Sequence, residues 1–222
     1  MSLKKFSELF GDLDSINSTN NKIEVLKRYF LSNKPIDNSW AIYLLTGKSN
    51  KRFISGRYLK NLFSQIYEYP VWLIDTCYLK VGDSAEVITL LLKNKSTSRK
   101  KKLSNISLNE LLSKTIPDLS KLNEEEKNLQ IKNIWERLPE DYHLIFNKIL
   151  TGTFRVGVSI GLITKSISKL INIDEEIISH RLMGNFKPSI DSYQFLINKN
   201  INLEELNSKP CLLYTSDAAD DA

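Results

Sequence analysis

The feature that most limits how this chain can fold is its apolar spacing, which follows the period of an α-helix along nearly the whole sequence. Ile23, Leu26 and Phe30 recur at helical intervals, and Ile131 and Ile134 repeat the pattern in the second half. Runs that alternate apolar and polar residues, as exposed strands do, are scarce. The pattern therefore predicts an all-α fold of about a dozen helices.

The prolines agree with this prediction, because a proline is tolerated in the first turn of a helix but not in its interior. Each stands where a helix is expected to start or stop: Pro35, Pro70, Pro117, Pro139, Pro188 and Pro210. Helix-start signals occur at Asp83, Asn123 and Asp174, whose side chains can accept a hydrogen bond from the first turn. Helices are therefore expected to follow these three residues.

One segment, residues 93–102, interrupts the helical pattern. It holds six basic side chains and no acidic or apolar one, so we expect an exposed connection, the basic loop. The loop divides residues 1–207 into parts 1–92 and 103–207. We expect these parts to be two lobes of a single helical domain, since the helices beside the loop carry apolar faces that need covering.

Composition excludes several classes of protein. The 222 residues carry 31 basic and 26 acidic side chains, and no apolar run is long enough to span a membrane or form a signal core. Cys77 and Cys211, with His143 and His180, show no metal-ligand spacing. We therefore expect a cytoplasmic protein, without a membrane partner or a metal site, that works as a monomer.

The last residues, 211–222, differ from the rest of the chain. They hold three acidic and no basic side chains in an Ala/Asp-rich run, whereas the preceding sequence is rich in Asn, Lys and Ile. Without them the net charge rises from +5 to 31 minus 23, or +8. We interpret this segment as a non-native tail, the alternative being a natural disordered acidic tail.

An internal repeat relates the two parts of the chain. Residues 44–55 read LLTGKSNKRFIS and residues 149–159 read ILTGTFRVGVS, the first with one extra residue between glycine and serine. Matching apolar residues follow each serine: Leu59, Phe63 and Ile66 in the first copy, and Ile163, Ile167 and Leu170 in the second. Each copy is predicted to be a helix, a glycine-containing turn and a serine-capped helix. We call them the first and second hairpins.

Each hairpin combines features that suit phosphate binding. Glycine permits a sharp turn and a close approach, and a serine-capped helix start presents N–H groups with partial positive charge. Basic residues stand nearby: Lys48, Lys51, Arg52 and Arg57 in the first hairpin, and Lys148, Arg155 and Lys165 in the second. Two such hairpins suit a DNA duplex. The residues alone leave open a helical protein-interaction module whose basic surface meets an acidic partner.

Several strings resemble one family. Residues 150–159, LTGTFRVGVS, look like the hallmark of the N-terminal DNA-binding domain of ATP-dependent DNA ligases. Residues 40–47 (WAIYLLTG), 81–86 (VGDSAE) and 180–184 (HRLMG) resemble its bacterial members, in family order. The resemblance covers nearly all of residues 1–207. It implies two pseudo-symmetric helical lobes that lie across the minor groove on both sides of a nick.

The resemblance also implies a larger enzyme, in which a nucleotidyltransferase domain and an OB domain complete a ring around DNA for repair, recombination or replication. There a lysine of a Lys-x-Asp-Gly motif takes AMP from ATP, and Mg²⁺ assists the sealing of the nick. This sequence has no such motif; residues 80–83, KVGD, have the wrong order. We therefore expect binding of nicked double-stranded DNA without self-adenylation, no cofactor in this chain, and no catalytic residue.

The family's DNA contacts are carried over by position. In the second hairpin Gly152 and Gly157 would bring amides to phosphate, Arg155 would reach the minor groove, and Ser159 would cap its helix and touch a phosphate. The first hairpin departs further from the family's pattern, with a phenylalanine and an extra residue in its turn. Its expected contacts are Gly47, Lys48, Arg52, Ser55 and Arg57.

Overall fold

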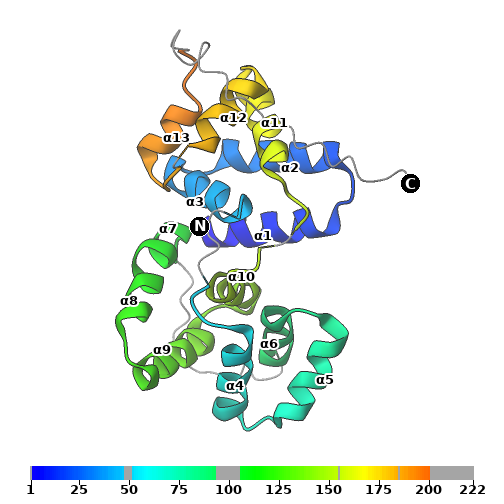
Figure 1. Cartoon of the computed structure of the whole chain (residues 1–222), viewed down its shortest axis with the longest axis vertical. Coiled ribbons are helices and arrows are strands. Elements are labelled where there is room, and N and C mark those ends of the chain that lie inside the picture. The colour runs from blue at the N-terminus through cyan, green and yellow to red at the C-terminus, as the bar shows by residue number, and fades with distance from the viewer. Residues whose placement is uncertain (1, 48–51, 94–105, 155, 185, 201–222) are drawn as a thin grey trace, which may run out of the picture.

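The computed structural model describes residues 2–47, 52–93, 106–154, 156–184 and 186–200, and within them every regular element is a helix (Figure 1). The predicted all-α class is confirmed. In chain order the elements are α1 (Ser2–Ser15), α2 (Thr19–Ser32), α3 (Pro35–Leu45), α4 (Gly56–Tyr67), α5 (Val71–Val81), α6 (Ser84–Lys93), α7 (Leu108–Glu110), the π-helical η1 (Leu111–Thr115), α8 (Ile116–Lys121), α9 (Glu124–Arg137), α10 (Glu140–Thr151), α11 (Ile160–Ile171), α12 (Glu175–Met183) and α13 (Ile190–Leu196).

Two of the three predicted helix starts have side-chain caps. Asp83 accepts a hydrogen bond from the amide of Glu86, and Asn123 accepts one from the amide of Glu126. Asp174 precedes α12 without a side-chain cap bond. Pro117 lies in the first turn of α8, which continues directly from η1. The wider π-helical turn before it reduces the conflict between the proline ring and the preceding helix.

The helices form two units stacked along the long axis of the molecule (Figure 1). The upper unit contains α1, α2 and α3 with α11, α12 and α13, and its main pairings are α2 with α11 and α3 with α13. The lower unit contains α4, α5 and α6 with α8, α9 and α10, and there α6 packs against both α4 and α10. Helix α7 contacts α1 and α3, between the units.

This grouping differs from the division at the basic loop that the sequence suggests. Each part of the chain, before and after the basic loop, contributes its first helices to one unit and its last helices to the other. Helix α13 of the second part therefore packs on α3 of the first, and α6 of the first part packs on α10 of the second. The chain passes between the units at the two hairpin turns (Figure 1). Of the basic loop, only Lys93 falls within the described residues.

The apolar core runs through both units and across the waist between them. Phe63 of α4 and Ile167 of α11, which occupy matching positions after the two serines, are both fully buried. At the waist the ring of Phe154 lies 6.2 Å from that of Phe6 and 6.0 Å from that of Phe10, both on α1. Helix α1 of the upper unit also packs against α10 of the lower unit. The units are thus joined both at the second hairpin turn and between these two helices.

No helix of the described residues is long and apolar enough to cross a membrane.

Candidate nucleic-acid interface

The first hairpin has the predicted construction. Helix α3 ends at Leu45, and the hydroxyl of Thr46 donates to the carbonyl of Ile42 at 2.7 Å. Gly47 then takes a φ of 69°, in the left-handed region that favours glycine. Before α4, the exposed Ser55 side chain accepts from the amide of Tyr58 at 3.0 Å.

The second hairpin repeats this geometry. The hydroxyl of Thr151 donates to the carbonyl of Asn147 at 2.9 Å, and Gly152 ends α10 with a φ of 67°. Gly157 is a further left-handed residue, with a φ of 61°. The exposed Ser159 caps α11 and accepts from the amide of Leu162 at 3.2 Å. Each turn therefore leads to a serine-capped helix N-terminus.

The two turns meet at the waist. The amides of Phe53 and Ile54 both donate to the carbonyl of Leu150 at 3.0 Å, so the first turn is bonded to the end of α10. A Cβ added at Gly152 would lie 3.3 Å from Cγ and 3.5 Å from Cα of Arg52. The structure thus brings together two segments that are about a hundred residues apart in the sequence, and leaves both capping serines exposed.

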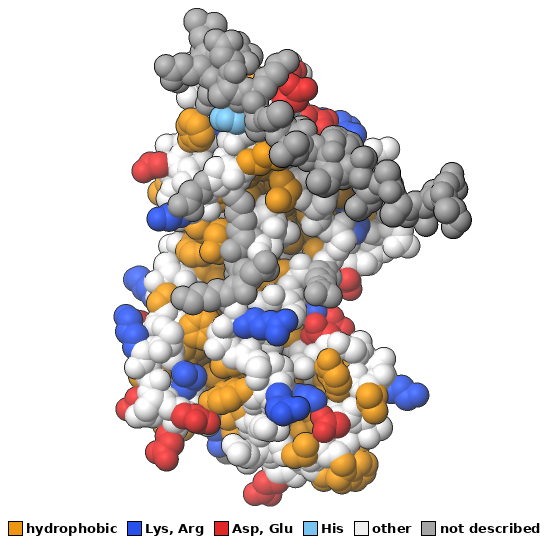
Figure 2. Space-filling view, in the orientation of Figure 1, with side chains coloured by type: hydrophobic (Ala, Val, Ile, Leu, Met, Phe, Trp, Pro, Cys, Tyr) orange, Lys and Arg blue, Asp and Glu red, His pale blue; other side chains and the backbone are white. Residues whose placement is uncertain are grey.

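The basic residues that the sequence places at the two hairpins differ in exposure. Arg52 and Arg57 are exposed, and Figure 2 shows basic side chains over the waist and over α4. Lys165 is half-buried. The site residues Lys48 and Arg155, and the flanking Lys51, lie outside the described residues.

Lys148, expected to flank the second hairpin as a free cation, is instead buried. Its ammonium nitrogen lies 3.0 Å from a carboxylate oxygen of Asp83 and 2.7 Å from one of Glu86. Two carboxylates therefore compensate its charge, and Lys148 connects α10 to α6 rather than offering a charge to phosphate. The sequence could not show this, because its partners are more than sixty residues away.

The family model for the DNA ligase N terminus matches residues 2–180. The chain belongs to this family. The matched range includes α1 to α11, both hairpins and the first part of α12. A comparison with curated proteins found no match.

In this DNA ligase N-terminal domain, residues 81–86 support both hairpins. Asp83 caps α6 and, with Glu86, binds Lys148 beneath the second turn. A Cβ added at Gly56 would lie 2.5 Å from the hydroxyl oxygen of Ser84, so the start of α4 rests directly against the start of α6. A larger residue at position 56 would displace the Ser84 side chain.

Sequence reasoning missed Lys22, a basic residue of α2. Its ammonium donates to the carbonyls of Val156 and Gly157 at 2.8 and 3.3 Å, within the second hairpin turn. Nothing in the local sequence distinguishes this lysine from exposed ones, since it lies 134 residues from its partner. The contact is visible only once α2 is packed against α11.

Tyr58 ties the start of α4 to α9. Its hydroxyl donates to the amide oxygen of Asn128 at 2.6 Å. Burial raises the pKa of Tyr58, the negative charge of Glu124 adds to this rise, and the bond to Asn128 opposes it. The hydroxyl therefore stays protonated at neutral pH and holds α4 in place.

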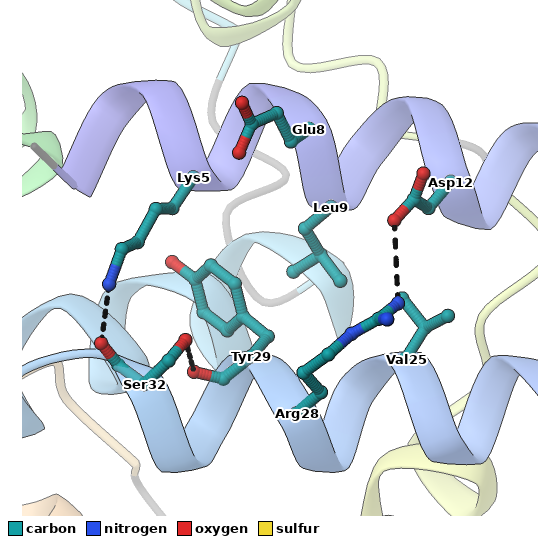
Figure 3. A pocket seen from close by; sticks show the side chains of 8 residues that line it. All are labelled: Lys5, Glu8, Leu9, Asp12, Val25, Arg28, Tyr29 and Ser32. Atoms are coloured by element: carbon teal, nitrogen blue, oxygen red, sulfur yellow. Dashed lines mark hydrogen bonds and ion pairs between the residues drawn. The ribbon is translucent and has the colours of Figure 1, made fainter.

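A pocket of about 410 Å³ lies between α1 and α2, and none of its lining residues belongs to a hairpin (Figure 3). Two contacts cross from one helix to the other: Lys5 donates to the carbonyl of Ser32 at 2.5 Å, and Arg28 lies 3.8 Å from Asp12. Because cations and carboxylates alternate there, the pocket does not suit a phosphate.

The family implies ATP and Mg²⁺ for the whole enzyme. The described residues contain no group of three His, Cys, Asp or Glu side chains that could hold a metal ion. Asp83 and Glu86, the acidic pair beside the interface, are occupied by Lys148.

Proposed function

We propose that this domain is the DNA-binding part of an ATP-dependent DNA ligase and clamps nicked double-stranded DNA through phosphate and minor-groove contacts. The observation that carries the proposal is the meeting of two serine-capped hairpins at the waist. The amides at the starts of α4 and α11 supply donors, and Arg52 and Arg57 supply charge. Contacts of this kind read the duplex backbone without reading bases, as a ligase that acts at any sequence requires.

The proposed contacts retain the residues expected from the sequence. Gly47 and Gly152 allow the turns, Ser55 and Ser159 present the helix starts, and Arg155 would enter the minor groove between the two phosphate stretches. Gly157 has a second role, because its carbonyl accepts from Lys22. Together with Lys48 these residues form a backbone-reading surface for nick sealing in repair, recombination or replication.

The remaining features of the proposal concern the whole enzyme. Adenylate transfer from ATP with Mg²⁺ requires a Lys-x-Asp-Gly motif, which this sequence does not contain. We therefore propose that this chain binds DNA without adenylating itself. We also propose that it acts as a cytoplasmic monomer.

Titration of the chain with a fluorescently labelled nicked duplex at several salt concentrations tests the proposal. With about five phosphate contacts, the logarithm of affinity should fall with the logarithm of salt at a slope of about −4 to −5. Binding that is insensitive to salt would contradict a phosphate interface. An absence of binding at moderate salt would favour the helical protein-interaction module with an acidic partner.

Comparing Ser159→Ala with a matched control separates an effect on duplex affinity from an effect on helix stability. Ser159→Ala should cost about 1 kcal/mol of unfolding free energy, because the cap of α11 is lost. It should also weaken duplex binding about fivefold, because the start of α11 loses a phosphate contact. The matched control is Asn123→Ala, which removes the exposed cap of α9 outside the hairpins. The control should lose similar stability and keep its affinity; equal affinity in both variants would exclude α11 from the interface.

A further inference from the structure

Lys22 occupies an unusual position for a lysine. It lies in the first turn of α2, where the helix dipole disfavours a cation, and only 8% of its surface is exposed. Within the described residues no carboxylate lies within ion-pair distance of its ammonium. Both of its observed partners are main-chain carbonyls, those of Val156 and Gly157.

These two carbonyls belong to the segment that leads into α11. Ser159, the cap of α11, follows Gly157 by two residues. By binding both carbonyls, Lys22 fixes the course of the turn just before the helix N-terminus. The contact also gives a reason for glycine at position 157: a Cβ there would lie 2.9 Å from the ammonium nitrogen, and the backbone has a φ of 61°.

We propose that Lys22 is a positioning residue of the duplex interface, which holds the second hairpin turn in the shape that presents α11 to a phosphate. This proposal rests on the proposed function. Lys22 acts through the turn because its ammonium is covered and already bonded to protein. Its charge is not cancelled by a carboxylate of the described residues, so it adds to the positive potential at the start of α11.

The test measures nicked-duplex affinity for Lys22→Met, together with circular dichroism and thermal unfolding. We expect affinity to fall about tenfold under conditions in which the variant remains folded, since two charge-assisted hydrogen bonds to the turn are lost. Lys27→Met is the matched control, because Lys27 lies on the same helix and pairs with Glu24. The control should bind within about twofold of wild type, since an exposed pair contributes little.

Two further variants distinguish positioning from general destabilisation. Lys22→Arg keeps a cationic donor and should bind within about threefold of wild type. Gly157→Ala disturbs the same contact from the other side and should weaken binding about tenfold. Because both changes disturb this contact, the loss of affinity in the double variant Lys22→Met/Gly157→Ala should be clearly smaller than the sum of the two single losses.

The outcomes are separable. If wild type does not bind nicked duplex, the proposed function fails. If wild type binds and Lys22→Met binds equally well, only the role of Lys22 fails. Fully additive losses in the double variant would also overturn the proposal. If Lys22→Met does not fold, Gly157→Ala and Lys22→Arg still test the role of Lys22. An affinity that Gly157→Ala leaves unchanged would contradict positioning by this contact. A loss of affinity in a folded Lys22→Arg would contradict it as well.

Discussion

Gly152→Ala is expected to lower the free energy of unfolding by about 1–3 kcal/mol and to weaken nicked-duplex binding about tenfold or more. The residue has a φ of 67°, which a side chain disfavours. The added Cβ would also crowd Arg52, at 3.3 Å from its Cγ. Because Arg52 belongs to the first turn and Gly152 to the second, one methyl group disturbs both hairpins where they touch.

The control for this change is another glycine-to-alanine substitution. Gly11 lies inside α1, and a Cβ added there would meet nothing within 4 Å. Gly11→Ala should raise the free energy of unfolding by about 0.5–1 kcal/mol, because alanine is the better helix former, and should leave duplex affinity unchanged. Urea unfolding and a fluorescence anisotropy titration measure both quantities. Equal effects of the two substitutions would contradict the described contact between the turns.

The second large effect is expected from Lys148→Met, which should lower the free energy of unfolding by about 2–4 kcal/mol. The change leaves Asp83 and Glu86 close together without their shared cation. We place the loss below that of a fully buried pair because the carboxylate side chains are partly exposed, at 23% and 42%. Urea unfolding measures the loss.

A rescue variant tests the cause of this loss. Adding Asp83→Asn and Glu86→Gln to Lys148→Met removes the unpaired charges while keeping a side chain that can cap α6 at position 83. The triple variant should recover about half or more of the lost stability. If the triple variant is as unstable as the single one, packing by the lysine stem, rather than charge, explains the loss.

Local patterns predicted the elements of this fold well. The apolar spacing identified the helices, and Asp83 and Asn123 were recognised as caps because capping depends on residues three positions apart. The glycine turns and serine caps of both hairpins were recognised for the same reason. The repeat also matched apolar residues after each serine, and two of these, Phe63 and Ile167, are buried.

Long-range packing was beyond these patterns. The apolar face of a helix looks the same whether it packs within its own repeat or against the other, so the exchange of α6 and α13 was not predicted. Lys22 and Lys148 look like surface residues in the sequence, yet both are buried at the hairpins. Their roles depend on partners at separations of 62 to 135 residues, which no local spacing encodes.

The exchange of helices between the repeats has a consequence for how the chain acquires its structure. In the lower unit, α6 from the first part of the chain packs against α10 from the second. In the upper unit, α3 from the first part packs against α13 from the second. An isolated half, ending at the basic loop, would leave these apolar faces bare. Neither unit is therefore complete until most of the polypeptide has been synthesised, and two separately produced halves would need each other to become ordered.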